Sequence, residues 1–306
     1  MNFIKLLKIT LVLLSISTLS SANQKVRTIA FAQDTMANDF RKAQVFEVRD
    51  AVAKHSNLKF VYSDAKGKTS LMIRQIEKFI ARKVDLIIVG TNNAKSVVPV
   101  VAKAYNGGIP IIVLDRGIDG NEYTSFINSD NIKIGTMGAK YIASQLKKKS
   151  TVLLFEGIQT ADVTHLRTKG FMDEIAKHKN LKVIKRTGNY LRKDAIVEME
   201  KLLKEGIKVD AIFSESDSML SGVRTVLHKY KINPASIIMV GCDYTSEAQE
   251  AIKKGTQSAS ILFPLGGKFS VDLALKIFNG EKVPKHIFIP VELVTKKNVN
   301  TMVPIF

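Results

Sequence analysis

The fold class of this chain is decided by residues 84–116, VDLIIVGTNNAKSVVPVVAKAYNGGIPIIVLDR. Two continuous apolar runs in this stretch, Asp85–Val89 and Pro110–Leu114, are typical of strands that are buried on both faces of a parallel sheet. The residues between them, 94–106, have helical spacing and are followed by Gly107-Gly108, which ends a helix. The stretch therefore predicts a strand–helix–strand unit.

The same alternation continues on both sides of this unit. Strands are predicted at residues 26–32, 58–62, 152–155, 181–186, 211–213, 237–240 and 258–263. Helices are predicted at residues 38–55, 69–82, 132–146, 164–178, 194–205, 218–230, 247–253 and 267–278. Strands separated by helices imply parallel sheets, and the units are too many for one small sheet. We therefore predict an α/β fold of two doubly wound, Rossmann-like lobes. A (β/α)8 barrel is the main alternative, and it explains the extended stretch 122–131 less well.

The first 22 residues have the pattern of a secretory signal peptide. Lys5 and Lys8 form a short basic region, and residues 9–19 form an apolar stretch after it. Ser20-Ser21-Ala22 then supplies the small residues of a cleavage site. The alternative is an uncleaved anchor, but the run is shorter than the roughly 20 residues that a spanning helix needs. We expect a mature chain that begins near Asn23 and works in the periplasm.

The composition excludes several classes of site. The 306 residues include 46 Lys+Arg and 28 Asp+Glu, so the formal net charge is +18. Such a charge suggests nucleic acid, but the lysines are scattered over the predicted helices without interleaved aromatic residues. The single cysteine, Cys242, excludes an intrachain disulfide and a cysteine-based metal site. We expect no nucleic-acid partner, no metal and no cofactor.

Polar and aromatic side chains gather directly after the predicted strands, where doubly wound sheets bind their ligands. Asp34 follows the first strand, Asp115-Arg116 follows the fourth, and Asp243 follows a strand of the second half. Carboxylates and guanidinium groups hydrogen-bond sugar hydroxyls, and aromatic rings cover the apolar face of a sugar. The combination predicts a sugar site. Individually, Asp115 or Asp243 could cap a helix or turn, and Arg167 could be a solvated surface residue.

Several longer motifs carry a family resemblance over nearly all of residues 26–295. They are IAFAQDTMANDF (29–40), VDLIIVGTNN (84–93), GIPIIVLDR (108–116), FINSDN (126–131), LLFEGI (153–158), RTKGF (167–171), AIFSESDSMLSG (211–222) and IIMVGCD (237–243). The chain resembles the periplasmic sugar-binding proteins of the ribose-binding type, which are the substrate-binding subunits of ATP-driven (ABC) sugar importers. Within this group it looks nearer to the galactofuranose-type branch than to the ribose binders.

The resemblance implies two lobes that are joined by a three-strand hinge and close over a ligand held in the cleft. The chain would cross between the lobes near residues 128–130, 258–263 and 288–292. After the signal peptide (1–22), residues 25–127 plus 260–288 would form the first lobe, and residues 128–259 plus 289–306 the second. The protein would be a monomer and would bind its ligand without turning it over.

Carried over residue by residue, the resemblance implies the following ligand contacts: Asp34, Asn38, Phe40, Arg41, Gly90, Asn92, Asp115, Arg116, Ser129, Asp130, Ile158, Arg167, Tyr190, Ser216, Asp243 and Phe263. Some of these positions depart from the ribose binders. Arg41 replaces an aromatic residue, Ser216 replaces an asparagine and Phe263 replaces a glutamine. These changes favour a sugar other than ribose. In the other interpretation, Arg41 pairs with Asp34 and only shapes the pocket.

Three further functions are weighed against sugar import. A sensor subunit would present a sugar or a furanosyl quorum signal to a membrane receptor kinase or chemoreceptor instead of a permease. Paired carboxylates could serve a glycosidase, but the sequence lacks the G-x-S-x-G, G-x-x-x-x-G-K-[ST], G-x-G-x-x-G and H-E-x-x-H motifs of common enzyme classes. A LacI-type repressor shares the lobes, but it begins with a DNA-binding helix-turn-helix. We therefore expect a binding protein and not an enzyme.

Overall fold

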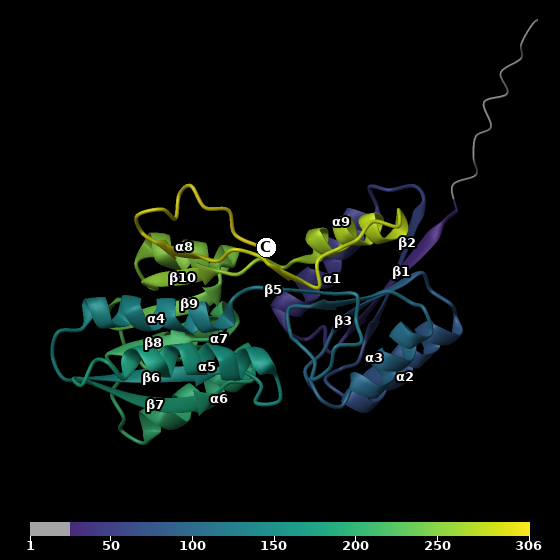
Figure 1. Cartoon of the computed structure of the whole chain (residues 1–306). Coiled ribbons are helices and arrows are strands. Elements are labelled where there is room, and N and C mark those ends of the chain that lie inside the picture. The colour runs from purple at the N-terminus through teal and green to yellow at the C-terminus, as the bar shows by residue number, and fades with distance from the viewer. Residues whose placement is uncertain (1–24) are drawn as a thin grey trace, which may run out of the picture.

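The computed structural model describes residues 25–306, and the predicted signal peptide lies outside these residues. The described chain forms two six-stranded sheets, A and B, each covered by helices on both faces (Figure 1). Two open sheets confirm the prediction of two α/β lobes and exclude the barrel. We call the lobe built on sheet A lobe A and the lobe built on sheet B lobe B.

Sheet A is parallel throughout and has the strand order β11-β5-β4-β3-β1-β2. Its strands are β1 (Arg27–Gln33), β2 (Leu58–Asp64), β3 (Leu86–Gly90), β4 (Ile111–Leu114), β5 (Ser125–Asn128) and β11 (His286–Phe288). Its helices are α1 (Asp39–Val52), α2 (Thr69–Ala81), α3 (Val98–Asn106) and α9 (Gly267–Phe278). The central strands β3 and β4 are wholly buried because α1 and α9 pack on one face and α2 and α3 on the other.

Sheet B has the order β12-β10-β9-β8-β6-β7, and only the pair β10–β12 is antiparallel. Its strands are β6 (Ser150–Glu156), β7 (Leu181–Thr187), β8 (Ala211–Ser214), β9 (Ile238–Asp243), β10 (Ala259–Leu262) and β12 (Glu292–Thr295). Its helices are α4 (Asn131–Gln145), α5 (Asp162–Ile175), α6 (Arg192–Lys204), α7 (Asp217–Lys229) and α8 (Ser246–Lys254), with a short 3-10 turn, η1 (Pro234–Ser236). Helices α4 and α5 cover one face, and α6 and α7 cover the other.

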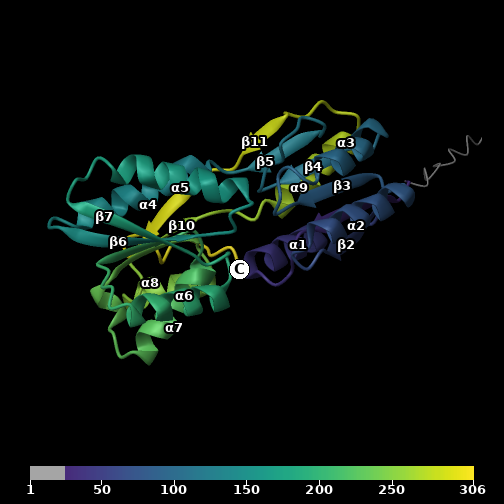
Figure 2. The same cartoon turned by 90° about the horizontal axis from the view of Figure 1, so that it is seen from below.

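Three segments connect the two sheets, at residues 129–130, 263–266 and 289–291. Figures 1 and 2 show the lobes side by side with the C-terminus at their junction. The expected lobe boundary at residue 260 falls inside β10, whose four residues all pair within sheet B. The chain leaves sheet B only after Leu262, because the backbone N–H and C=O groups of β10 are hydrogen-bonded to the neighbouring strands β9 and β12. The remaining lobe boundaries stay a prediction.

One helix begins later than its spacing predicts. The expected helix at residues 94–106 is α3, which starts at Val98 and follows a turn over residues 94–97. Pro99 lies in its first turn. Proline has no backbone N–H to donate and a fixed φ, so it starts a helix more readily than it continues one.

Candidate functional site

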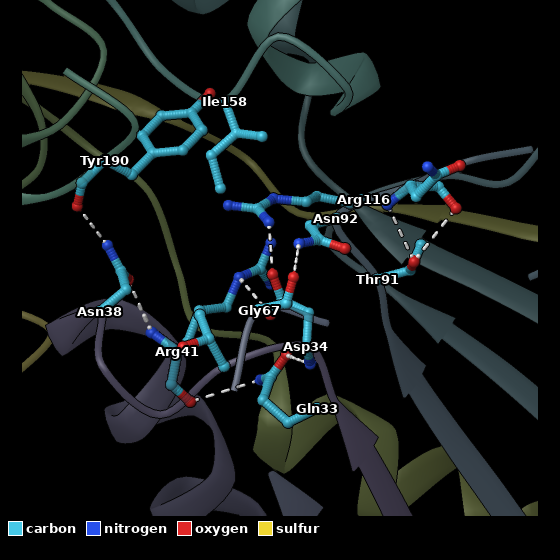
Figure 3. Close-up of polar contacts among 12 residues, drawn as sticks. Gln33, Asp34, Asn38, Arg41, Gly67, Thr91, Asn92, Arg116, Ile158 and Tyr190 are labelled. Atoms are coloured by element: carbon cyan, nitrogen blue, oxygen red, sulfur yellow. Dashed lines mark hydrogen bonds and ion pairs between the residues drawn. The ribbon is translucent and has the colours of Figure 1, made fainter. Parts of the chain in front are cut away.

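Four charged side chains of lobe A, Asp34, Arg41, Asp115 and Arg116, form a buried cluster at the carboxyl ends of β1 and β4. Figure 3 shows Asp34, Arg41 and Arg116 of this cluster. Arg41 Nη1 lies 2.7 Å from Asp115 Oδ2, and Arg116 Nη1 donates to Asp34 Oδ2 at 2.9 Å. Arg41 Nε also lies 3.7 Å from Asp34 Oδ1. All four residues are at most 5% exposed. The proposed pairing of Arg41 with Asp34 is present, and the contact of Arg41 with Asp115 is closer.

The cluster leaves hydrogen-bonding capacity unused. Asp34 Oδ1, Arg41 Nη2, Asp115 Oδ1 and Arg116 Nε are buried atoms without a hydrogen-bond partner. A buried polar atom without a partner costs free energy of about 1–3 kcal/mol, so four in one place are expected to serve a purpose. Two of these atoms are donors and two are acceptors. Hydroxyl groups, which both donate and accept hydrogen bonds, would pair with all four. Burial lowers the pKa of Arg41, and the neighbouring Arg116 lowers it further.

Lobe B faces this cluster with Arg167, Tyr190 and Asp243. Arg167 lies on α5, where its Nε donates to Asn131 Oδ1 at 2.8 Å and its Nη1 donates to the carbonyl of Glu215 at 2.7 Å. Asp243 ends β9 and is 4% exposed. Burial raises the pKa of Asp243 well above its ordinary value, and the nearby Asp217 adds to the shift. Lobe B therefore adds one fixed cation and one carboxyl group that resists ionisation.

Aromatic rings form the apolar part of the cavity. Phe40 of α1 stacks on Phe263 with 5.2 Å between ring centroids and an interplanar angle of 24°. The guanidinium of Arg167 lies 4.7 Å from the Phe263 centroid, and that of Arg116 lies 5.1 Å from the Tyr190 centroid. Rings and guanidinium planes stacked in this way offer flat faces between which a sugar ring fits.

Backbone strain coincides with the site. Asp115 (φ 69°), Tyr190 (φ 60°) and Asp243 (φ 110°) have positive φ values, which residues with a Cβ rarely adopt. Such a residue costs about 1–3 kcal/mol and persists only where its surroundings hold it. Three strained residues around one cavity indicate that the fold is organised to present these side chains.

Contacts between the lobes close the cavity. Asn38 Nδ2 of lobe A donates to the carbonyl of Tyr190 at 2.6 Å, and Gly117 N donates to Asp162 Oδ2 of lobe B at 2.9 Å. Thr160 Oγ1 of lobe B donates to the carbonyl of Asn92 at 2.7 Å. The enclosed cavity has a volume of about 20 Å³, close to the space that one water molecule needs. A sugar therefore requires the lobes or the lining side chains to move.

The structure brings together most of the residues that the sequence singled out. The cavity is lined by Asn38, Phe40, Arg41, Asp115, Arg116, Val163, Arg167, Tyr190, Asp243 and Phe263. Asp34 does not line the cavity, but it forms ion pairs with two residues that do, Arg41 and Arg116. Ile158 lies beside Tyr190, facing the charged cluster (Figure 3).

Besides Asp34 and Ile158, five predicted contacts lie outside this lining. Asp130 is exposed and accepts from Lys133 N at 2.9 Å, and Ser216 accepts from Met219 N at 3.3 Å, so both serve as helix caps. Gly90 is packed against Gln33, because a Cβ at this position would lie 2.6 Å from Gln33 Oε1. Asn92 bonds across the lobes through its carbonyl, and Ser129 Oγ is buried without a partner. Whether these five contact a ligand stays a prediction.

Sequence reasoning missed two residues at the start of α5. Val163 lines the cavity, and Asp162 accepts the backbone N–H of Gly117 from the opposite lobe. The sequence signal is weak, since an aspartate at a helix start is common and a valine after it suggests only core packing. Both roles depend on lobe A lying against this helix end, which no local pattern encodes.

A larger groove of about 590 Å³ lies along α1, between this helix and the C-terminal residues Ile305 and Phe306. It is lined by Phe46, Leu265 and Phe306 together with charged residues of both signs. Glu47, which borders it, caps α9 by accepting from Gly267 N at 2.6 Å. The groove contains none of the buried unpartnered atoms or strained residues of the smaller cavity. We therefore place the candidate site in the cavity between the lobes.

Two searches of the described residues gave negative results. Within residues 25–306, no group of three or more His, Cys, Asp or Glu side chains is arranged to hold a metal ion. In the same part of the chain, no helix has the length and apolar character needed to cross a membrane.

Comparisons with known proteins agree with this geometry. Residues 29–282 match the family model of the periplasmic binding protein domain. The ribose import binding protein of Haemophilus influenzae is 31% identical over 92% of this chain and 95% of its own length. A crystal structure from Mycobacterium smegmatis in complex with β-D-fucofuranose has a TM-score of 0.85 and 27% identity, covering 90% of this chain and 93% of that one. The fructose-binding periplasmic domain of a hybrid two-component system has a TM-score of 0.84 and 26% identity, with coverages of 90% and 93%.

Proposed function

Because this chain belongs to the periplasmic binding protein family, we propose that it captures one monosaccharide or related polyol between its lobes and delivers it to an ABC-type importer. The relatives of this chain are substrate-binding proteins and not enzymes, and we assign ligand binding to the cavity between the lobes. The observation that supports the proposal best is that Asp115 of lobe A and Asp243 of lobe B line one cavity.

The chemistry of the cavity suits a neutral polyhydroxylated ring. Unpartnered donors (Arg41 Nη2, Arg116 Nε) and acceptors (Asp115 Oδ1) surround the space, so hydroxyls that both donate and accept would be matched. Phe40 and Phe263 would cover an apolar C–H face. Each of the three arginines already has partners inside the protein, since Arg41 pairs with Asp115, Arg116 pairs with Asp34 and Arg167 donates to Asn131 and to the Glu215 carbonyl. The cavity therefore does not require an acidic group on the ligand.

The mechanism that we propose is hinge closure. Since the contacts come from both lobes, a ligand makes its full set only when the lobes meet, and it shifts the population toward the closed form. The three connecting segments between the sheets would carry the rotation. We place this function in the periplasm, after removal of the predicted signal peptide, and propose a monomer with the importer permease as its membrane partner.

A sensor subunit is the second candidate. It is favoured by the similarity of the whole fold to the fructose-binding periplasmic domain of a hybrid two-component system. The two functions share the ligand site and differ in the membrane partner. Deleting the permease gene would abolish uptake of the ligand if the chain serves import, and deleting a receptor kinase gene would abolish the transcriptional response if it serves sensing.

The contact between Asn38 and Tyr190 provides a direct test of closure. Asn38→Asp keeps the side-chain oxygen that caps α1 by accepting from Arg41 N at 3.0 Å, but it loses the Nδ2 donor to lobe B. We expect ligand affinity to fall at least about tenfold, because the closed form loses a hydrogen bond and instead places a carboxylate oxygen against the Tyr190 carbonyl.

The matched control is Asn38→Ala, which removes both the cap and the donor. It is expected to lower the unfolding free energy by a further ~1 kcal/mol. Calorimetry measures the affinities and thermal denaturation the stabilities. Unchanged affinity in Asn38→Asp would show that this contact takes no part in closure.

A further inference from the structure

Glu215 occupies a fully buried position behind the ligand cavity, directly after β8. Its Oε2 accepts from Gly157 N at 2.9 Å and from the Tyr190 hydroxyl at 3.2 Å. Its backbone carbonyl accepts from Arg167 Nη1 at 2.7 Å. Glu215 therefore contacts two of the residues that line the cavity without lining the cavity itself.

The other oxygen of Glu215 takes part in an unusual arrangement. Thr168 Oγ1 lies 3.0 Å from Glu215 Oε1 and 2.9 Å from Glu156 Oε1. A threonine hydroxyl has one proton to donate, so both contacts are hydrogen bonds only if one of the two carboxyl groups is protonated. Lys185 Nζ forms an ion pair with Glu156 Oε1 at 3.0 Å. The extra proton is therefore best placed on Glu215, which then donates to Thr168 while Thr168 donates to Glu156.

The charges around Glu215 agree with this assignment. Burial raises the pKa of Glu215 to about 7, the guanidinium of Arg167 opposes the shift, and the carboxylate of Glu156 adds to it. Glu156 comes from β6, Thr168 and Arg167 from α5, Lys185 from β7, and Tyr190 from the loop after β7. Among residues 25–306, the cation that acts on Glu215 is Arg167, and its Nη1 already donates to the Glu215 carbonyl.

The network continues from Glu215 to the junction of the lobes. The Tyr190 hydroxyl lies 2.8 Å from Thr164 Oγ1, and the Tyr190 ring stacks under Arg116 of lobe A. The Tyr190 carbonyl accepts from Asn38 of lobe A. Closure therefore covers Tyr190 with lobe A side chains and removes water from the side of the network that faces the cleft, which further disfavours a charge on Glu215.

We propose that Glu215 is a proton-linked positioning residue, which takes up a proton as the lobes close and holds Tyr190 against the ligand. This inference rests on the proposed function, because it describes the control of the same site. It predicts that ligand capture weakens as the pH rises, although the ligand itself carries no titratable group.

The direction of the pH effect follows from linkage. The pKa of Glu215 is about 7 in the closed structure. We expect it to be lower in the open form, where water reaches the network, so the closed form binds more protons. The contribution of Glu215 to affinity should be largest near pH 5, fall as the pH rises toward 7, and level off above 7. We expect the Kd at pH 8 to be at least threefold that at pH 5.5.

The experiment is a calorimetric titration from pH 5 to 8.5 with the sugar that the wild-type protein binds best in a monosaccharide panel. Glu215→Gln keeps a donor for Thr168 and an acceptor for Gly157 but cannot ionise, so its affinity should lose the wild-type slope. Glu156→Gln removes the charge that raises the pKa of Glu215, so its midpoint should move to lower pH. A Glu215→Gln variant that keeps the wild-type slope would overturn the proposal.

Two further measurements keep the test decisive. Because Glu156, Thr168 and Glu215 all belong to lobe B, proton sharing should keep the pKa of Glu215 above the ordinary glutamate value even in the open form. Titrating the carboxyl carbon of Glu215 by NMR without ligand tests this, and an ordinary pKa would overturn proton sharing even if a sugar binds. If no sugar binds but the pKa is raised, the proposed function fails and the proton-sharing arrangement stands. Should Glu215→Gln not fold, Glu156→Gln carries the test, and an unmoved midpoint counts against the proposal.

Discussion

Asp243→Ala is expected to weaken sugar binding about 100-fold, which corresponds to about 2.7 kcal/mol. Asp243 lines the cavity from lobe B, at the end of β9, and its strained backbone holds the side chain in place. Each hydrogen bond between a sugar hydroxyl and a charged or strongly polarised group contributes about 1.5–3 kcal/mol, and a carboxyl group makes up to two such bonds to neighbouring hydroxyls.

The pair Asp115→Ala and Asp272→Ala completes this test. Asp115→Ala should weaken binding at least as much, and it should also lower stability, because Arg41 loses its closest anionic partner inside the protein. Asp272 is exposed on α9 and serves as the control, with affinity expected to match that of the wild type. Wild-type affinity in both Asp115→Ala and Asp243→Ala would show that the cavity between the lobes is not the ligand site.

Gly135→Ala is expected to lower the unfolding free energy by about 3 kcal/mol, at the upper end of the usual cost of overpacking. Gly135 lies where α4 crosses α5, and a Cβ there would lie 2.0 Å from the carbonyl oxygen of Arg167 and 2.6 Å from Phe171 N. These are backbone atoms, so the helices themselves must separate. Helix propensity alone predicts the opposite sign, since alanine favours a helix over glycine by about 1 kcal/mol.

Gly135→Ala should also weaken ligand binding. Pushing the carbonyl of Arg167 away moves the guanidinium that bonds Asn131 and Glu215, so affinity should fall together with stability. Denaturant unfolding measures the first effect and calorimetry the second. Ser144→Ala, at an exposed position of α4, is the control and should change neither quantity. A Gly135→Ala variant as stable as the wild type would show that α4 and α5 are less closely packed than the structure has them.

The prediction of the fold from sequence succeeded where burial dominates local structure. The runs at 85–89 and 110–114 are apolar at nearly every position, and both form central strands of sheet A. The apolar spacing predicts too early a start for α3. Pro99 fits this spacing and affects the helix only through its missing backbone N–H, which the spacing does not register. The break between β10 and the segment 263–266 could not be located, since the apolar pattern continues across it.

The cavity is lined by predicted residues at strand ends, whereas residues whose surroundings come from the other lobe were not predicted. Asp115, Arg116 and Asp243 follow buried strands directly, so the sheet topology alone places them. Asp162 and Val163 acquire their roles only when lobe A meets the start of α5. Asp130 and Ser216 have the same polar character as ligand contacts, but their side chains are used by helix ends.

The formal net charge of +18 requires no function other than ligand binding. The arginines that matter are Arg41, Arg116 and Arg167, which are at most 4% exposed and lie in the cavity. Most lysines of the described chain are solvent-exposed on helices and strand ends, where pairs such as Lys169–Asp173 and Lys201–Glu198 are worth little.

The most direct test of the central claim is a calorimetric titration of the mature protein against pentoses, hexoses, furanosides and cyclitols, run with wild type and Asp243→Ala. We expect at least one neutral member of the panel to bind the wild-type protein one-to-one with a Kd in the micromolar range or below, and Asp243→Ala to bind it about 100-fold more weakly. No binding by any member, or equal binding by both proteins, would contradict it.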